Sequence, residues 1–381
     1  MKLGKNNWEK LKFEKLVFNI SERVEPQDTT LNKYIGLEHL EPGKIQIEHW
    51  GTPDEVIGTK LKIYKGDIIF AKRRAYQRKA AVVNFDAICS AHSMVFRINE
   101  LLVDKNYFLA FIHSDMFMNR AIEISEGSLS PTIKWKTLAN QDFPLPPLNE
   151  QKEIASLFQS IESALECLKG QEEKLKALQK TLVNGLLNRE AIFGNLLNNK
   201  NCTPTTIGDL AECDKKYPEH VNEISRFVGL EFIETDNFLL QGWGEMSDGT
   251  TFTKRFVKGD VLFGKRRAYL KKVAVADFDG VCSGDILVIR AKVKKILQGL
   301  LPYYISSDAF IQHAVSTSAG SLSPRTKWKD LAELEVSIPD LKTQEKILGV
   351  LLQLNFTVDQ LKQQKVTLKN LKKKLLNEIL G

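Results

Sequence analysis

The sequence predicts an α+β protein built from two copies of one unit, each a mixed α/β globular domain followed by a long helix. The first observation is a repeat: KGDIIFAKRRAYQRKAAVVNFDAICS at 65–90 returns as KGDVLFGKRRAYLKKVAVADFDGVCS at 258–283, an offset of 193 residues. The second is a heptad pattern that closes each copy. A period this long excludes a solenoid and indicates a duplicated unit with an approximate two-fold axis.

The repeat and the heptads divide the 381 residues into five parts. We expect globular domains over 1–148 and 204–342, long helices over 149–190 and 343–381, and a linker over 191–203. No apolar run reaches the ~18–20 residues that a membrane helix needs, so we expect no membrane segment. The five cysteines are odd in number and contain no Cys-x-x-Cys pair, which favours a reducing cytoplasm over a disulfide framework.

Strands in the globular domain are predicted from short apolar runs bounded by turn residues. Ile68, Ile69 and Phe70 follow Gly66 and Asp67 in this way. The β-branched residues and the Gly and Asp punctuation are typical of strands. A single helix is expected around 107–121.

The long helices are predicted from a proline-rich boundary and a 4-3-4-3 apolar rhythm. Asn149 is the expected N-cap of the first helix, with Glu150 and Glu153 in its first turn. About five heptads in each helix indicate an antiparallel coiled coil between the two copies; the alternative is two separate amphipathic helices, each on its own domain. The heptad positions are Ile154, Phe158, Ile161, Leu165, Leu168, Leu175 and Leu182, followed by Ile347, Leu351, Leu354, Val358, Leu361, Leu368 and Leu375.

Positive charge is concentrated in two octets, KRRAYQRK at 72–79 and KRRAYLKK at 265–272, with five basic residues in each. Their ten charges exceed the net charge of +7, so the rest of the chain is slightly acidic. Two compact basic clusters in a nearly neutral chain indicate a phosphate-rich partner held at two places. Solvated lysine- and arginine-rich turns are the alternative.

Motifs of catalysis are absent from the sequence. It contains no G-x-x-x-x-G-K-S/T loop, no G-x-G-x-x-G, no G-x-S-x-G and no H-E-x-x-H. Asp67 and Asp86 recur as Asp260 and Asp279, a pattern that a nuclease would also show. A turn or strand-start role is favoured, because Asp67 stands between Gly66 and an apolar run. We therefore expect no enzyme activity, no cofactor and no metal site.

The basic octets and a repeated hydroxyl-rich loop favour a binding function. Arginine suits bidentate contact with guanine, and lysine, hydroxyl and backbone N–H groups suit phosphate. The hydroxyl-rich turn Gly-Ser-Leu-Ser-Pro occurs at 127–131 and 320–324, each time followed by Lys-Trp-Lys. The candidate DNA-binding residues are Lys72, Arg73, Arg74, Tyr76, Arg78, Lys79, Ser128, Ser130 and Lys134, with Lys265, Arg266, Arg267, Tyr269, Lys271, Lys272, Ser321, Ser323 and Lys327 in the second copy.

The segment FPLPPLNEQKEI at 143–154 resembles the signature that joins a target-recognition domain to its helix in specificity subunits of type I restriction–modification systems. The order of domain, helix, domain and helix also resembles that family. The second copy, SIPDLKTQ at 337–344, keeps Gln344 but lacks the double proline and the glutamate. The resemblance implies a non-catalytic subunit whose domains each read half of a split double-stranded DNA target. It also implies helices that set the spacer and dock methyltransferase subunits, with motor-nuclease subunits joining for restriction.

Two other readings stay open at this point. One is the specificity subunit of a type IIB-like methyltransferase–nuclease, and the other is a coiled-coil scaffold whose basic domains bind protein or RNA. The copies share 18 of 34 residues between 65–98 and 258–291, so we expect related half-sites in inverted orientation. Inserting one heptad in a helix would lengthen the spacer by roughly 10 Å, about three base pairs.

Overall fold

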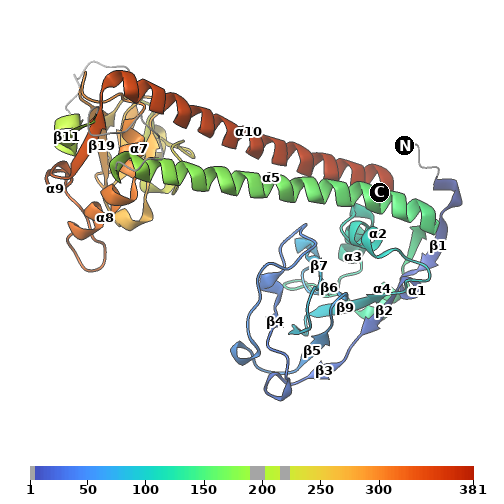
Figure 1. Cartoon of the computed structure of the whole chain (residues 1–381). Helices are drawn as coiled ribbons and strands as arrows, with labels where there is room; N and C mark the ends of the chain where they lie inside the picture. The colour runs from blue at the N-terminus through green and yellow to red at the C-terminus, as the bar shows by residue number, and fades with distance from the viewer. Residues whose placement is uncertain (1–4, 189–201, 215–223) are drawn as a thin grey trace. The chain divides into compact units, whose positions relative to one another are not determined.

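The computed structural model describes residues 5–188, 202–214 and 224–381. These residues form two compact units, Met1–Lys169 with Gln363–Gly381 and Gly170–Lys362, called unit 1 and unit 2 (Figure 1). The long helices α5 (Leu148–Asn188) and α10 (Leu341–Leu380) each contribute a segment to both units. In the described part of the chain, no helix is long and apolar enough to cross a membrane.

Unit 1 is built on two four-stranded sheets and a strand pair. The first sheet is antiparallel, and its order is β2 (Val17–Ile20), β9 (Ser93–Ile98), β6 (Ile68–Ala71) and β7 (Ala80–Val82). The second has the order β3 (Arg23–Val24), β5 (Lys60–Ile63), β8 (Ala87–Cys89) and β4 (Tyr34–Ile35), with β4 and β8 parallel. β1 (Glu9–Lys12) pairs with β10 (Asp142–Leu145), which leads into α5. The strand at 68–70 is where the apolar run predicted it.

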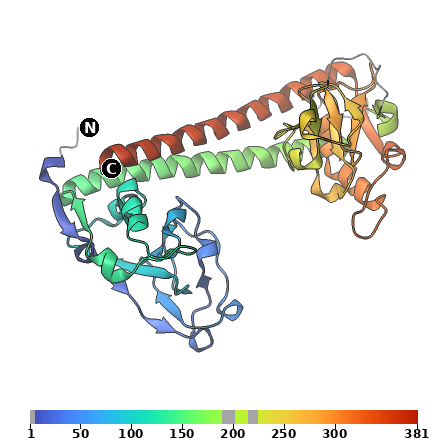
Figure 2. The same cartoon turned by 180° about the vertical axis from the view of Figure 1, so that it is seen from behind.

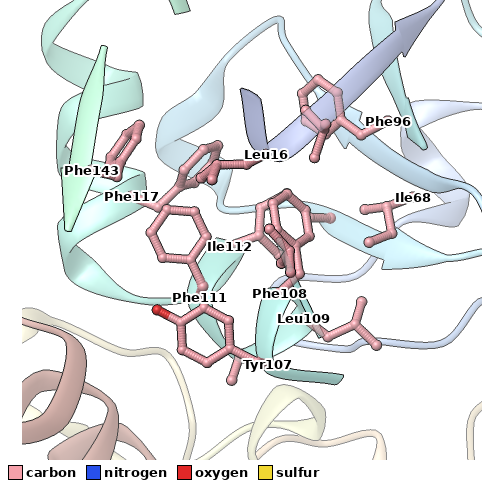
Figure 3. Packing of buried hydrophobic residues seen from close by; sticks show 14 of the residues in the cluster. Leu16, Ile68, Phe96, Tyr107, Phe108, Leu109, Phe111, Ile112, Phe117 and Phe143 are labelled. Atoms are coloured by element: carbon pink, nitrogen blue, oxygen red, sulfur yellow. The ribbon is translucent and has the colours of Figure 1, made fainter. Parts of the chain in front are cut away.

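Aromatic packing holds the helices of unit 1 against the first sheet (Figure 3). Phe117 lies edge-to-face with Phe70 of β6, at a ring-centroid distance of 5.4 Å, and with Phe111 at 5.5 Å. Phe143 lies edge-to-face with Phe111 at 5.2 Å. The helices of this layer are α1 (Phe13–Leu16), α2 (Lys105–Ile112), α3 (Asp115–Glu123) and α4 (Trp135–Ala139). The single helix expected around 107–121 is therefore wrong. It is two helices, because Ser114 leaves the helical path and caps α3 by accepting a hydrogen bond from Phe117 N.

Unit 2 repeats most of this architecture at the offset of 193, with a different edge strand in its second sheet. Its strands are β12 (Ala211–Cys213), β19 (Ile286–Ala291), β16 (Val261–Gly264) and β17 (Val273–Val275) in one sheet, and β14 (Gly244–Glu245), β13 (Arg226–Val228), β18 (Gly280–Cys282) and β15 (Lys254–Phe256) in the other. Its helices are α6 (Ile207–Leu210), α7 (Leu301–Ser306), α8 (Asp308–Ser316) and α9 (Trp328–Ala332). β11 (Cys202–Thr206) pairs with β20 (Glu335–Pro339). Most of the expected linker, 191–201, lies outside the described residues, and its last two residues begin β11.

A buried glutamine fixes each long helix to its globular domain. Gln151 accepts a hydrogen bond from Asp104 N at 2.8 Å and donates to the carbonyls of Leu102 and Pro146. Gln344 does the same with Leu297 N, Lys295 O and Pro339 O. This shared structural task accounts for the glutamine that both copies keep.

The helices begin slightly before the residues expected from the sequence. α5 starts at Leu148 because Pro147 O already accepts the first helical hydrogen bond, from Gln151 N, so Asn149 lies inside the helix. α10 starts at Leu341, where Asp340 caps it by accepting a hydrogen bond from Thr343 N at 2.9 Å.

Segments of α5 and α10 lie side by side in each unit and run in opposite directions (Figures 1 and 2). In unit 1, Glu162 forms an ion pair with Lys372. In unit 2, Gln179 donates a hydrogen bond to Asn355 at 2.7 Å. Nine heptad positions are buried, namely Ile154, Phe158, Ile161, Leu182, Ile347, Leu351, Leu354, Val358 and Leu361, and five are half-buried, namely Leu165, Leu168, Leu175, Leu368 and Leu375. Continuous coiled-coil packing of these positions stays a prediction.

Candidate nucleic-acid interface

The basic octet of unit 1 connects two neighbouring strands of the first sheet. Lys72 follows β6 directly, a one-turn 3-10 helix spans Ala75–Gln77, and β7 begins at Ala80. In unit 2 the octet connects β16 and β17 in the same way, with a 3-10 turn at Ala268–Leu270. Rigid strands therefore hold both ends of each basic segment.

Two residues of each octet adopt the left-handed conformation. Arg74 and Arg78 have φ of 58° and 55°, and Arg267 and Lys271 have φ of 53° and 51°. This region costs a residue with a side chain about 1–2 kcal/mol, which is why glycine or asparagine is common there. Both copies keep long basic side chains at these positions, a pattern that favours a functional role for the loop.

The octet and the Gly-Ser-Leu-Ser-Pro loop, far apart in sequence, lie together in each unit. Arg73 Nε donates to Ser130 Oγ at 2.7 Å, and Arg74 N donates to Pro131 O at 2.7 Å. In unit 2, Arg266 Nε donates to Ser323 Oγ at 2.6 Å. We call the surface formed by 72–79 and 127–131, and by 265–272 and 320–324, the paired-loop surface of units 1 and 2.

Several predicted side chains of the paired-loop surface face solvent. Tyr76 and Tyr269 are 52% and 53% exposed. The exposed set also includes Arg74, Ser128, Lys134, Arg267, Ser321 and Lys327. Lys134 lies 2.6 Å from the carboxylate of Glu126, an exposed ion pair that contributes at most about 1 kcal/mol and is easily replaced by a phosphate.

Four other predicted residues are held by groups of their own unit. Lys79 Nζ donates to Leu37 O and Lys272 Nζ donates to Leu230 O, each at 2.7 Å. Arg78 pairs with Asp115 at 2.5 Å, and Lys271 pairs with Asp308 at 2.5 Å. These contacts fasten the octet to α3, α8 and the neighbouring turns, so these four side chains position the loop.

Lys72 and Lys265 are half-buried at the start of each octet. Burial lowers the pKa of Lys72, and the nearby charge of Arg23 lowers it further. Lys72 O accepts a hydrogen bond from Ile133 N, and Lys265 O accepts one from Thr326 N. Their backbones therefore tie the octet to the segment that follows the second loop.

The two surfaces differ at one pair of positions beside the shared arginine. In unit 2, Asp285 lies 3.5 Å from Arg266 Nη1 and accepts from Arg325 Nε at 2.7 Å. Hydrogen bonding from Arg325 is the main cause that lowers the pKa of Asp285. In unit 1 the corresponding residues are His92, 3.3 Å from Arg73 Nη1, and Thr132. Burial, with the charges of Arg73 and Lys72, lowers the pKa of His92.

Each unit also contains a cation next to two aromatic rings, a group that was not predicted from the sequence. Lys33 Nζ lies 4.2 Å from the ring centroid of Trp50 and 3.9 Å from that of Phe85. Arg226, Trp243 and Phe278 form the same group in unit 2, with 4.3 Å from the guanidinium to the tryptophan ring. The tryptophans are 45% and 43% exposed. The signal was available, because Trp50 and Phe85 recur at the offset of 193 and arginine replaces the lysine.

The recurring aspartates have structural partners, as the turn interpretation expected. Asp67 is buried, accepts from Tyr64 N and pairs with Arg97 at 2.8 Å. Asp86 accepts from Lys65 N at 2.8 Å. Asp260 pairs with Arg290 in the same way. Asp67 and Asp86 thus accept hydrogen bonds from the backbone of the turns beside them.

One cluster of potential metal ligands occurs among the described residues, formed by exposed Glu41, Glu48 and His49. Lys44 lies 2.9 Å from both carboxylates. Lys169 lies 3.2 Å from Glu48 as well, so two lysines balance the two carboxylates of this cluster.

The family model for the type I restriction modification DNA specificity domain matches residues 17–177 and 199–370. The chain is 25% identical over 309 residues to the type I restriction enzyme EcoDI specificity subunit of Escherichia coli, covering 72% of this chain and 68% of that protein. A chain from a structure of a type I R-M system matches 99% of this chain and 98% of its own length, with a TM-score of 0.61 at 18% identity.

The type I restriction–modification S subunit from M. genitalium shares the fold as well. It covers 100% of this chain and 98% of its own, with a TM-score of 0.56 at 15% identity. Because these identities are low, the solved structures show only that the fold is shared. The family model shows which family the chain belongs to. Because that model matches most of both halves, this chain belongs to the family of type I restriction–modification DNA specificity subunits.

Proposed function

We propose that the paired-loop surface of each unit reads one half of a split DNA target. The observation that supports this most is the Arg73–Ser130 hydrogen bond and its counterpart Arg266–Ser323, which give both units the same pre-oriented arginine. Nε is engaged by the serine, and Nη1 lies beside His92 in unit 1 and beside Asp285 in unit 2. On binding, the two terminal nitrogens are proposed to exchange these neighbours for the O6 and N7 acceptors of a guanine in the major groove. Pre-orientation lowers the entropy lost on binding.

Arg74 and Arg267, with Tyr76 and Tyr269, are proposed to contact the phosphate backbone and fix the register on the duplex. Their side chains are exposed. Arg74 and Arg267 adopt the left-handed backbone conformation at the start of the 3-10 turn that carries the tyrosine. Contacts of this type carry affinity and salt dependence, whereas contacts to base edges carry specificity. Lys134 and Lys327, at the other side of the loop, are proposed to do the same.

The long helices are proposed to dock methyltransferase subunits, with motor-nuclease subunits joining the assembly in the cytoplasm, where the DNA lies. Unit 2 offers a shallow apolar groove between its segments of α5 and α10, which includes Leu178, Leu182, Val350 and Leu354. Two buried seams with apolar groups left on the outside are the arrangement from which a helix bundle grows. Leu178 and Val350 are 46% and 47% exposed.

The test is a pair of double substitutions in the complex with its methyltransferase. Arg73→Ala with Arg74→Ala should weaken one half-site, and Arg266→Ala with Arg267→Ala the other. A lost bidentate base contact costs about 1–3 kcal/mol and relaxes the choice at one base pair, whereas a lost phosphate contact weakens all sequences alike and lowers the salt slope. Arg120→Ala with Lys152→Ala, both exposed in unit 1, is the charge-matched control. Unchanged affinity and salt slope in both double variants would remove these arginines from the interface.

A further inference from the structure

The apex of each Gly-Ser-Leu-Ser-Pro loop is a leucine that almost nothing covers. Leu129 is 92% exposed and Leu322 is 90% exposed. Single exposed leucines are common on proteins. These two, however, occupy the same position of a five-residue loop that is identical in both units, next to the arginines of the paired-loop surface.

The loop that carries the leucine is closed at its base by backbone hydrogen bonds. Glu126 and Thr132 exchange N–H···O bonds of 3.0 and 2.9 Å, and Ala319 and Arg325 exchange two of 3.0 Å. Gly127, with φ of 106°, makes the turn that a residue with a side chain would resist. The leucine is thus at the tip of a short loop that one β-bridge closes at its base.

The surroundings of the loop favour DNA as the group that covers the leucine. In unit 1 the Arg73 side chain donates a hydrogen bond to Ser130, the residue that directly follows the leucine, and Arg74 N donates to Pro131 O. A hydrophobic protein contact would bury these cations beside it, at a large desolvation cost. A duplex gives the arginines phosphates or guanines and gives the apex a groove.

Undistorted B-DNA favours the major groove for such a loop. The major groove, about 12 Å wide, admits protein segments without deformation, whereas an apolar side chain that enters the minor groove, about 6 Å wide, commonly unstacks bases and kinks the duplex. Among the groups on major-groove base edges, the C5-methyl of thymine is the apolar one. A leucine in the major groove can therefore make an apolar contact with the thymine methyl group.

We propose that Leu129 and Leu322 each contact the C5-methyl group of a thymine in their half-site and so select an A·T pair beside the base pair read by the arginine. The inference rests on the proposed function, because it needs the paired-loop surface to face DNA. It adds an apolar element to a readout otherwise made of cations and hydroxyls. The duplicated leucine predicts that both half-sites contain such a thymine.

The experiment uses the full chain with its methyltransferase and a duplex that carries the sequence the complex methylates. Each thymine of one half-site is replaced in turn by deoxyuridine, which removes the methyl group alone. At one thymine we expect about fourfold weaker binding by the unsubstituted protein, the loss expected for one buried methyl. Leu129→Ser should weaken binding to the thymine duplex by about 3- to 30-fold, and its deoxyuridine penalty at that position should vanish.

Controls separate this contact from general effects. Ile57→Ser removes a 93% exposed apolar side chain elsewhere in unit 1 and should change neither measurement. Leu322→Ser should act on the other half-site alone. Equal binding by Leu129→Ser and Ile57→Ser would overturn the proposal, as would a deoxyuridine penalty that persists in Leu129→Ser.

Three further outcomes also decide between the proposals. If Leu129→Ser keeps its DNA affinity but no longer copurifies with the methyltransferase, the apex contacts protein and the proposal is wrong. If the unsubstituted complex shows no preference for the duplex over a scrambled one, the proposed function itself fails. A complex that binds its target selectively but ignores both Leu→Ser changes would contradict the leucine contact and leave the proposed function standing.

Discussion

Arg325 donates a hydrogen bond from Nε to Oδ1 of Asp285 at 2.7 Å. The same carboxylate lies 3.5 Å from Arg266 Nη1. The ion pair between Asp285 and Arg325 therefore lies beside Arg266 in unit 2. In unit 1, His92 and Thr132 take these places, and no carboxylate faces Arg73 among the hydrogen bonds and ion pairs of the described residues. Two arginines with identical sequence surroundings therefore have different electrostatic surroundings.

Exchanging these residues should change what a half-site contains. Asp285→His with Arg325→Thr frees Arg266 from its carboxylate, and we expect the unit 2 half-site to shift toward that of unit 1 at one base pair. His92→Asp with Thr132→Arg should do the reverse. Methylation mapping of cells that carry each variant gives the answer. Glu100 and Val293 are both exposed and are related by the same offset of 193, so their exchange is the control. If the variant His92→Asp with Thr132→Arg methylates the original sequence unchanged, these residues do not affect base choice.

Asp67→Asn should destabilise unit 1 and leave target choice intact. The substitution removes a buried carboxylate that accepts from Arg97 and from Tyr64 N. We expect a loss of about 2–4 kcal/mol, less than for a fully buried pair because Arg97 is half exposed and stays hydrated. Denaturant unfolding measures the loss, with exposed Asp54→Asn as the control. Full stability combined with lost methylation would instead revive a catalytic reading of this aspartate.

Unit 1 should lose stability in acid because of His113. Burial, with the charges of Lys372 and Arg78, lowers the pKa of His113 to about 3. The folded state therefore keeps the ring neutral, whereas the unfolded state takes up a proton below about pH 6.5. The free energy of unfolding should fall by up to about 1.4 kcal/mol per pH unit as the pH drops from about 6.5 toward 3.

His113→Ser tests the acid effect, since Ser306 occupies the matching position of unit 2. The variant should show a shallower dependence of unfolding free energy on pH between about 6.5 and 5, even if the smaller side chain lowers stability throughout. Substitution of exposed His49 by serine is the control and should keep the original slope. An unchanged slope in His113→Ser would assign the acid sensitivity to other groups.

Leu175→Asp with Leu368→Asp should disrupt the helix packing of both units. Leu175 packs against the core of unit 2, and Leu368 packs against the core of unit 1. A carboxylate there would be desolvated or would force the helices apart, so we expect loss of folding and of methyltransferase copurification. Leu178→Asp with Leu371→Asp, at positions 46% and 45% exposed, should fold normally. A seam variant that stays folded and retains its methyltransferase would show that the seam is not required.

Periodicity and repetition made much of the fold predictable. The offset of 193 anticipated two units of like topology, and the heptads anticipated the long helices, because each signal repeats and small local errors average out. The break at Ser114 was not predicted, because a single capping hydroxyl decides it and apolar periodicity continues across it. The early start of α10 depended likewise on one cap, Asp340.

The site was predictable in composition and not in geometry. Sequence singled out both the octets and the loops, but their meeting through Arg73 and Ser130 is a contact between residues 57 positions apart. The sequence also did not show which octet side chains face solvent and which are held within the unit, since Lys79 donates to Leu37 O, in the 3-10 helix Leu37–His39. Trp50 and Trp243 escaped notice because the repeat is weaker in the segments before residue 65.

Methylation mapping of DNA from cells that express this chain with its methyltransferase shows whether each unit reads one half of a split target. We expect one split target, with a fixed spacer and with one half resembling the reverse complement of the other, because both units present the same arginine–serine pair. Two unrelated half-sites, or a single uninterrupted target, would contradict it. The shared residues of the paired-loop surface would then be scaffold.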